Sequence, residues 1–161
     1  MAVYRILASS DPLLRQVAKP VNKINTGVFR VLDNMADSMK NANGVGLAAP
    51  QIGVSKRIIV VDAGEGGLIE LINPEIIESS GLQTGREGCL SVPGMHGMVT
   101  RSQRVLIKGL DREGNEQVYE GTDYLARVFQ HEVDHLDGII YIDLVEELEE
   151  DDEEDFDEEE G

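Results

Sequence analysis

The stretch VFQHEVDHLDG, Val128–Gly138, contains two histidines four residues apart, and a glutamate directly follows the first of them. On an α-helix, side chains at this spacing lie one above the other. His131 and His135 can therefore direct their ring nitrogens at one cation while Glu132 stays beside it. A charged helix with two half-buried histidines would show the same letters, so the side of the helix on which the glutamate lies decides between the two interpretations.

The apolar pattern around this stretch predicts a helix from Thr122 to Gly138, along which successive residues are rotated by about 100°. One arc of that helix contains Tyr124, Leu125, Val128, Phe129, Glu132, His135 and Leu136, with His131 at its edge; the opposite side contains Asp123, Ala126, Arg127, Gln130 and Asp134. A carboxylate on the apolar side is strongly disfavoured unless its charge is compensated. We therefore interpret the stretch as a metal site on a helix that faces the core.

A catalytic site of this kind needs a third protein ligand and an open position for water. The extended motif H-E-x-x-H-x-x-G-x-x-H fails, because Tyr141 stands where its last histidine is required. A downstream glutamate could come only from the charged C-terminal run, which has no apolar face to hold it. The strongest candidate is Cys89 in GREGCLSVPG, with His96 as the weaker alternative. A lone buried cysteine can also be only a small apolar side chain.

The rest of the chain predicts helices first and strands after them. A short helix is expected between Pro12 and Pro20, and a longer amphipathic one from Thr26 to its stop at Gly44. Short β-branched segments predict strands at residues 57–63, 68–77, 104–111 and 116–121, with a hairpin turn at 111–115 and a final strand or extended segment at 139–145. This order predicts an α+β fold with antiparallel pairing.

The net charge of −17 comes mostly from the C-terminus, where residues 146–160 include 13 acids and no Lys or Arg. Without them, 18 acidic side chains remain against 14 basic ones, which is an ordinary balance. Such a run buries too little apolar surface to offset its ordering entropy. We therefore expect one catalytic domain, residues 1–145, and a disordered acidic tail, residues 146–161, which would repel nucleic acid.

Cysteine usage and hydropathy indicate the compartment. Cys89 is the single cysteine, so no internal disulfide can form and the chain fits a reducing environment. The N-terminal residues lack the apolar region of a secretion signal, and no apolar run approaches the length of a membrane span. We expect a cytoplasmic protein without a membrane segment.

The segment GVGLAA, residues 44–49, matches a dinucleotide-binding fingerprint, but its context argues against one. The fingerprint should follow a strand and open a helix, whereas here it follows an amphipathic helix, and Pro50 and Gly53 prevent a crossover helix. The glycines fit better beside a substrate that lies close to the backbone. Gln51 could then donate to an oxyanion, or it could be an ordinary turn residue.

Three segments, GVGLAAPQ, EGCLS and QHEVDH, follow one another in that order. Together they resemble the motifs G-φ-G-φ-A-A-x-Q, E-G-C-φ-S and H-E-φ-D-H of the peptide deformylase family, where φ is apolar. The resemblance extends from about Tyr4 to Val145. It implies an α+β fold in which antiparallel sheets pack around a central, metal-binding C-terminal helix. It also implies a hydrolase that removes the formyl group from the N-terminal N-formylmethionine of newly made polypeptides and releases formate.

The resemblance implies a role for each matching residue. Cys89, His131 and His135 would bind a divalent ion, usually Fe²⁺ in the cell, with Zn²⁺ or Ni²⁺ as substitutes in purified protein. Glu132 would act as general base and then acid, and Gln51 with the backbone N–H of Leu90 would hold the oxyanion. The pocket for the methionine side chain would be lined by Val45, Gly46, Tyr124 and Val128.

Two departures from the family limit these expectations. The chain ends in acids where some relatives have a basic helix that docks on the ribosome, so only transient proximity to the ribosome is expected. His96 stands where relatives often have an arginine near the substrate backbone, while Glu87 and Arg101 are expected to pair as in relatives. The alternatives to a deformylase are a metal-dependent endopeptidase and an inactive scaffold that captures partners through its acidic tail.

Overall fold

The computed structural model describes residues 2–64 and 66–151. Its two main helices are α1 (Thr26–Asn41) and α2 (Asp123–Leu136). One sheet has the order β1-β2-β3-β6-β7, formed by Gly46–Ala48, Ile58–Val61, Ile69–Ser80, Arg104–Leu110 and Glu116–Thr122. A smaller sheet has the order β4-β5-β8, formed by Gln83–Cys89, Val92–Arg101 and Glu149–Glu150. All strand pairs within the two sheets are antiparallel, which confirms the predicted α+β fold.

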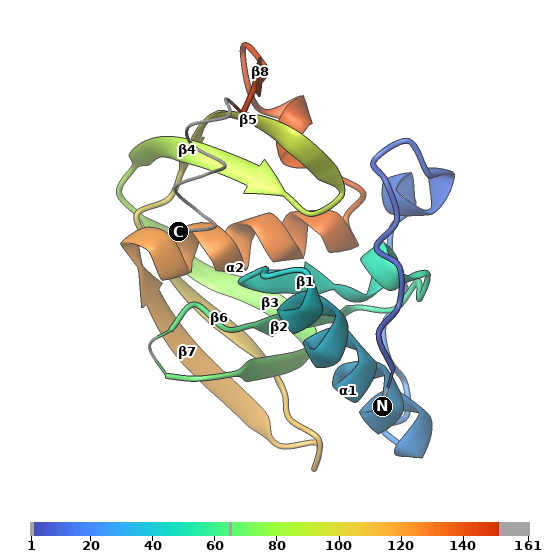
Figure 1. The fold of residues 1–161 in the computed structure, drawn as a ribbon. Coiled ribbons are helices and arrows are strands. Elements are labelled where there is room, and N and C mark those ends of the chain that lie inside the picture. Colours follow the sequence, from blue (N-terminus) through green and yellow to red (C-terminus); the bar gives the residue numbers. More distant parts are fainter. Residues whose placement is uncertain (1, 65, 152–161) are drawn as a thin grey trace.

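Helix α2 lies between the two sheets, as Figure 1 shows. Phe129 and Leu136 are fully buried in one apolar cluster with Ile107 and Val105 of β6, because the apolar face of the helix needs a sheet to cover it. The other side of α2 faces β4 and β5. The helix therefore has little surface left for solvent.

This sandwiched position corrects the projection of α2 made from the sequence. Ala126 and Arg127, predicted on the polar side, have only 0% and 5% of their surface exposed, whereas Tyr124, predicted on the apolar side, is 55% exposed. A projection with one apolar arc assumes one narrow covered face, whereas here the apolar cluster of the five-stranded sheet extends to Ala126 and β4 covers Arg127, which lies 3.5 Å from Glu87. Glu132 and both histidines are buried, as predicted.

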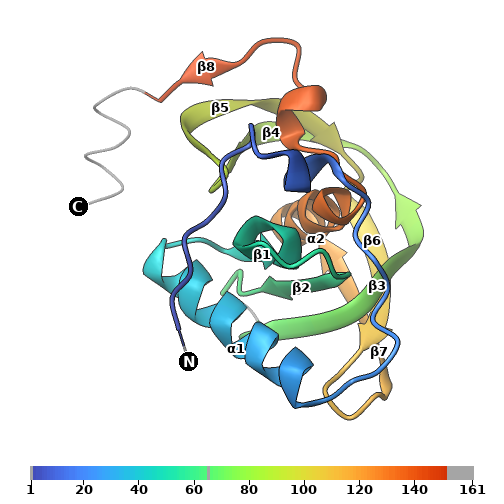
Figure 2. The same cartoon turned by 90° about the vertical axis from the view of Figure 1, so that its right-hand side faces the viewer.

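Helix α1 closes the other side of the five-stranded sheet, as the view in Figure 2 shows. Its side chains Leu32, Met35 and Met39 are fully buried with Leu47 of β1 and Val60 of β2. The side-chain oxygen of its N-cap residue, Asn25, accepts a hydrogen bond from the Val28 N–H at 3.2 Å, which satisfies one of the free donors of the first turn. The helix thereby fixes the chain that continues into β1.

Three short 3-10 turns complete the described chain: Pro12–Arg15, Ala49–Ile52 and Tyr141–Asp143. The first, Pro12–Arg15, forms only the beginning of the short helix that was expected between Pro12 and Pro20. The last replaces the strand or extended segment expected at 139–145, because the Asp143 carboxylate accepts the Ile140 N–H and folds the chain into a turn. Within the described residues, no helix is long and apolar enough to cross a membrane.

Candidate metal centre

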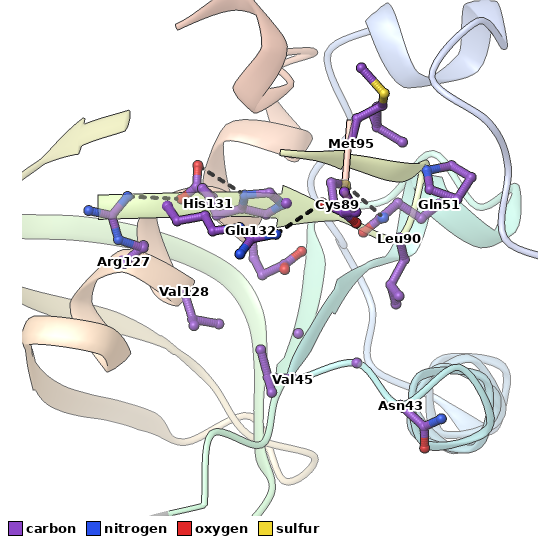
Figure 3. Close-up of a pocket in the computed structure, with 18 of the residues that line it drawn as sticks. Asn43, Val45, Gln51, Cys89, Leu90, Met95, Arg127, Val128, His131 and Glu132 are labelled. Atoms are coloured by element: carbon purple, nitrogen blue, oxygen red, sulfur yellow. Dashed lines mark hydrogen bonds and ion pairs between the residues drawn. The ribbon is translucent and has the colours of Figure 1, made fainter. Parts of the chain in front are cut away.

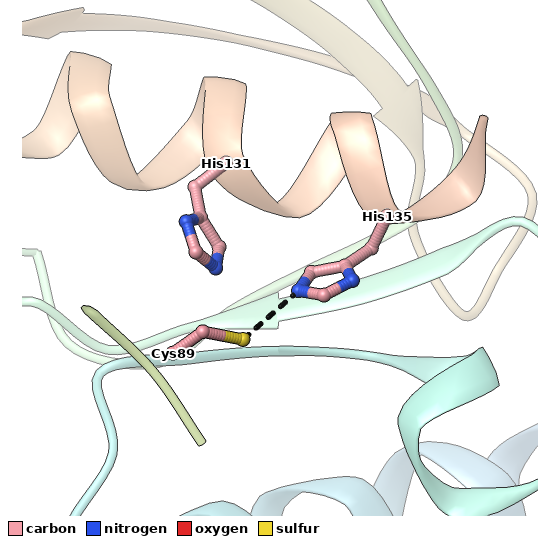
Figure 4. A group of neighbouring side chains, drawn as sticks. All are labelled: Cys89, His131 and His135. Atoms are coloured by element: carbon pink, nitrogen blue, oxygen red, sulfur yellow. Dashed lines mark hydrogen bonds between the residues drawn. The ribbon is translucent and has the colours of Figure 1, made fainter. Parts of the chain in front are cut away.

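The last residue of β4 and two residues of α2 bring three potential metal ligands together (Figure 4). One ligand atom from each of Cys89, His131 and His135 lies within 4.8 Å of the other two. The Cys89 sulfur is 3.3 Å from Nε2 of His135. One thiolate with two imidazoles is a donor set that suits zinc, iron or nickel and leaves room for a further ligand.

Glu132 supplies a second observation that fits a cation. Only 4% of this residue is exposed, and its Oε1 atom has no hydrogen-bond partner among the described residues. Burial is the main cause that raises the pKa of Glu132 to about 7. A buried carboxylate next to a sulfur and two imidazoles is stabilised when a positive ion occupies the space that these groups share.

A buried ion-pair network contacts His131 at its ring nitrogen Nδ1. Nδ1 of His131 lies 3.4 Å from Oε2 of Glu87, and the guanidinium of Arg101 donates to both Glu87 oxygens, at 3.2 and 2.7 Å. Arg101 also pairs with Asp134, and Arg127 lies 3.5 Å from Glu87. A partner on the second nitrogen of a ligating histidine fixes the orientation of its ring. The predicted pair of Glu87 and Arg101 is thus part of a larger network.

The network also sets the charge of its members. Burial raises the pKa of Glu87, but hydrogen bonds with His131 and Arg101 outweigh it and lower that pKa to about 2. For His131, burial lowers the pKa, and the contacts with Cys89 and Glu87 outweigh it and raise the pKa well above its usual value. Burial and the nearby His131 both lower the pKa of His135.

Gln51 lies across the site from α2, in the turn Ala49–Ile52, with 1% of its surface exposed. Its Oε1 accepts the Ala48 N–H at 2.9 Å, and its Nε2 donates to Ser91 Oγ at 3.0 Å. The same Nε2 is 3.7 Å from the Cys89 sulfur (Figure 3). The amide orientation is therefore fixed at both ends. Ser91 was not singled out from the sequence, although it is the last letter of the motif EGCLS.

A cavity of about 430 Å³ opens in front of these groups. The predicted site residues that line it are Val45, Gly46, Gln51, Cys89, Leu90, Tyr124, Val128, His131 and Glu132. His135 is not among the lining residues and is 1% exposed, so it lies behind the others. Among the predicted site residues, Tyr124 and Val45 are at the open side, 55% and 37% exposed.

Gly46 allows β1 to approach the carboxylate closely. A Cβ atom at this position would lie 2.5 Å from Oε2 of Glu132, closer than such contacts occur. β1 is also the edge strand of its sheet, so one side of its backbone is not paired within that sheet. The glycine therefore brings a free strand edge next to the buried glutamate.

His96, the alternative third ligand, lies elsewhere. Its Nδ1 is 2.6 Å from Asp151 and its Nε2 is 3.1 Å from Glu149, both in the C-terminal segment. The group of potential metal ligands found among the described residues does not include it. The folded chain thus brings Cys89, and not His96, to the pair of histidines.

Comparison with known proteins gives one consistent family. The sequence model of the polypeptide deformylase family matches residues 3–151. A peptide deformylase of Syntrophomonas wolfei is 59% identical over 143 residues, which are 89% of this chain and 93% of that protein. One from Carboxydothermus hydrogenoformans is 58% identical with the same coverage. The crystal structure of peptide deformylase from Thermotoga maritima superposes with a TM-score of 0.88 at 41% identity, covering 91% of this chain and 100% of that one.

Proposed function

The chain belongs to the polypeptide deformylase family of metal-dependent hydrolases, which remove the formyl group from the N-formylmethionine of nascent peptides, and we propose a role in that reaction for each residue of the cavity. The observation that supports the assignment most is the meeting of the Cys89 sulfur with His131 and His135 beside the buried Glu132. The resemblance of the three sequence motifs is confirmed at the level of the family.

We assign Cys89, His131 and His135 as the ligands of one divalent ion. When bound there, the ion would lower the pKa of a water ligand and polarise the formyl carbonyl. We propose Fe²⁺ in the cell and Zn²⁺ or Ni²⁺ as substitutes in purified protein, because a mixed thiolate and imidazole set accepts all three. Elemental analysis of protein purified without oxygen tests the identity of the ion.

Glu132 is proposed as the group that moves the proton. It accepts a proton from the attacking water as the new C–O bond forms at the formyl carbon. It then donates that proton to the methionine nitrogen as the C–N bond breaks, and the second proton of the water also passes to the amine, so that formate and an ammonium group are the products. Its unpartnered Oε1 and its position on the cavity wall support this role.

Gln51 and the backbone N–H of Leu90 are proposed to hold the negative charge that develops on the formyl oxygen. Donors that are fixed before the reaction stabilise such charge without reorganising. The two hydrogen bonds that lock the Gln51 amide, one to Ala48 and one to Ser91, support this assignment. Leu90 directly follows the ligand Cys89 and lines the same cavity.

The methionine side chain is proposed to bind among Val45, Gly46, Tyr124 and Val128, which line the cavity together. An extended peptide can add to the edge strand β1 by main-chain hydrogen bonds. Main-chain pairing tolerates many sequences, whereas the apolar pocket selects the first residue. This division suits an enzyme that acts on many nascent chains.

The remaining expectations concern the surroundings of the enzyme. We propose residues 1–145 as the catalytic domain and residues 146–161 as an acidic tail; the disorder expected for the tail is wrong for residues 149–151, which pair with β5, and residues 152–161 lie outside the described residues. We also propose a cytoplasmic location, where a lone cysteine ligand stays reduced, with transient ribosome proximity and no nucleic-acid partner. The proposed domain boundary is supported by the positions of the predicted site residues, which all lie before residue 146.

Formate release distinguishes this function from its alternatives. The anaerobically purified protein should release formate from formyl-methionyl-alanyl-serine and leave the unblocked tripeptide intact. Cleavage of an internal peptide bond without formate would indicate an endopeptidase. Binding of metal without turnover of either peptide would indicate a scaffold. Cys89→Ala should lose metal, whereas His96→Ala should keep it.

A further inference from the structure

The end of the described acidic C-terminal segment, residues 149–151, pairs with β5, and its last residue, Asp151, lines the cavity. β8 pairs with β5 in antiparallel register, Glu149 opposite His96 and Glu150 opposite Met95. The Asp151 N–H then donates to the Gly94 carbonyl at 2.8 Å, which extends the pairing by one residue. Figure 2 shows β8 lying along β5 at the outer side of the smaller sheet.

The side chain of Asp151 points toward the cavity from this position. Its Oδ1 is 2.6 Å from Nδ1 of His96 and 3.1 Å from Nη2 of Arg86. The contact with His96 is the largest cause that lowers the pKa of Asp151, so the carboxylate is ionised at neutral pH. Asp151 and Arg86 both line the cavity, together with Met95 and Gly94. Neither Glu149 nor Glu150 is among the lining residues.

The burial of the lining residues distinguishes a deep end of the cavity from an outer end. Glu132 and Gln51 are 4% and 1% exposed, whereas the side chain of Asp151 is 34% exposed. The reacting formyl group belongs at the deep end, beside Glu132. A peptide that starts there leaves through the exposed part of the cavity, which Asp151 lines, so the residues after the methionine come near the charge that is fixed there.

The described acidic segment adds negative charge around this outer end. Residues 146–151 carry five carboxylates, of which that of Asp151 lines the cavity, where it pairs with Arg86 of β4 at 3.1 Å. A peptide side chain at the outer end is close to Asp151 in particular, since that carboxylate is the one that lines the cavity. Opposite charges attract and like charges repel across such short distances, and the effect weakens with salt.

We propose that Asp151 is a specificity-determining residue, which makes the enzyme favour formyl-methionyl peptides with a basic side chain shortly after the methionine and disfavour those with an acidic one. This inference rests on the proposed function of the same cavity. The proposal assigns the described part of the acidic segment a role in substrate selection. The Asp151 carboxylate, which backbone pairing holds in place, attracts basic and repels acidic side chains of the bound peptide.

The test compares kcat/KM for formate release from three peptides, formyl-Met-Ala-Lys-Ala, formyl-Met-Ala-Gln-Ala and formyl-Met-Ala-Glu-Ala. A second series moves the charged residue one place along the peptide in each direction. The full-length, metal-loaded enzyme is used at low ionic strength. The variant is Asp151→Asn, which keeps the size of the side chain and its ability to hydrogen-bond His96. The matched control is Glu150→Gln, which removes one carboxylate from the adjacent residue that does not line the cavity.

The wild type should prefer the lysine over the glutamate peptide, and Asp151→Asn should lower that ratio about threefold to tenfold, as expected for a partly exposed charge that meets either sign. Glu150→Gln should change the ratio less than about twofold. Added salt should reduce the wild-type ratio, which tests the idea without any substitution.

An unchanged ratio in Asp151→Asn would overturn the inference. Equal effects of the two variants would also overturn it, since they would indicate a diffuse field of the whole segment. If the wild-type enzyme, like both variants, released no formate from any of the peptides, that result would contradict the proposed function instead.

Discussion

Replacing Gly46 with alanine should disable the site with a single methyl group. The added Cβ would lie 2.5 Å from Oε2 of Glu132, and ordinary contacts begin at 3.4 Å, so the carboxylate must move by about 0.9 Å. A displacement of about 1 Å at a reacting group costs about 100-fold in rate, which corresponds to about 2.7 kcal/mol. We therefore expect kcat/KM for formate release to fall about 100-fold.

The assay compares Gly46→Ala with wild type for formate release, metal content and thermal unfolding. Metal content should stay near one ion per chain, because the substitution contacts Glu132 and not a ligand. Gly27→Ala in α1 is the matched control: its Cβ would approach only the Asn25 side chain, at 3.2 Å, and turnover should persist. Wild-type turnover by Gly46→Ala, with metal and stability unchanged, would refute the idea that the present position of Glu132 is required.

Further predictions concern proton transfer, the buried network and the hairpin turn. Glu132→Gln should keep the metal and lose at least about 100-fold in formate release, since an amide cannot accept the proton; full activity would place the base elsewhere. Arg101→Leu removes two hydrogen bonds from the buried Glu87, which keeps only Arg127 and His131 as partners, and should lower the free energy of unfolding by about 3 kcal/mol in urea titrations; a loss below about 1 kcal/mol would contradict the network's importance. The Asp111 carboxylate accepts the N–H groups of Asn115 and Glu113 at 2.9 and 3.0 Å, and chiefly the first lowers its pKa. Its contribution to the turn is therefore complete above the usual aspartate pKa and lost as the pH falls through the lower folded value, so the protection of these amides, measured relative to the intrinsic exchange rate at each pH, should fall only in acid; a loss of protection already at neutral pH would contradict this.

The sequence predicted the elements whose local pattern agrees with their final surroundings. α1 has one apolar stripe and one covering sheet, so its periodicity sufficed. β2, β3, β6 and β7 are rich in β-branched residues and were expected. The elements that were not expected lack such a pattern. β4 includes two glycines and β5 a proline with two glycines, and their pairing with each other, rather than their propensity, makes them strands.

The candidate site was predictable where motifs mark it and unpredictable where the fold assembles it. The spacing of the two histidines indicates a ligand pair, and the sequence favours Cys89 over His96 as third ligand, but it does not show how either residue reaches the pair. The β4–β5 hairpin carries Cys89 to α2 and turns His96 toward the C-terminal segment. Charge composition alone could not indicate that Asp151 reaches the cavity, because this depends on the pairing of β8 with β5.

The most direct test of the metal centre is X-ray absorption spectroscopy at the metal edge on anaerobically purified, active protein. A coordination shell with one sulfur and two imidazole nitrogens is predicted, completed by lighter oxygen donors. A shell without sulfur in the active enzyme would contradict the assignment of Cys89 and, with it, the centre on which the roles of Glu132 and Gln51 depend.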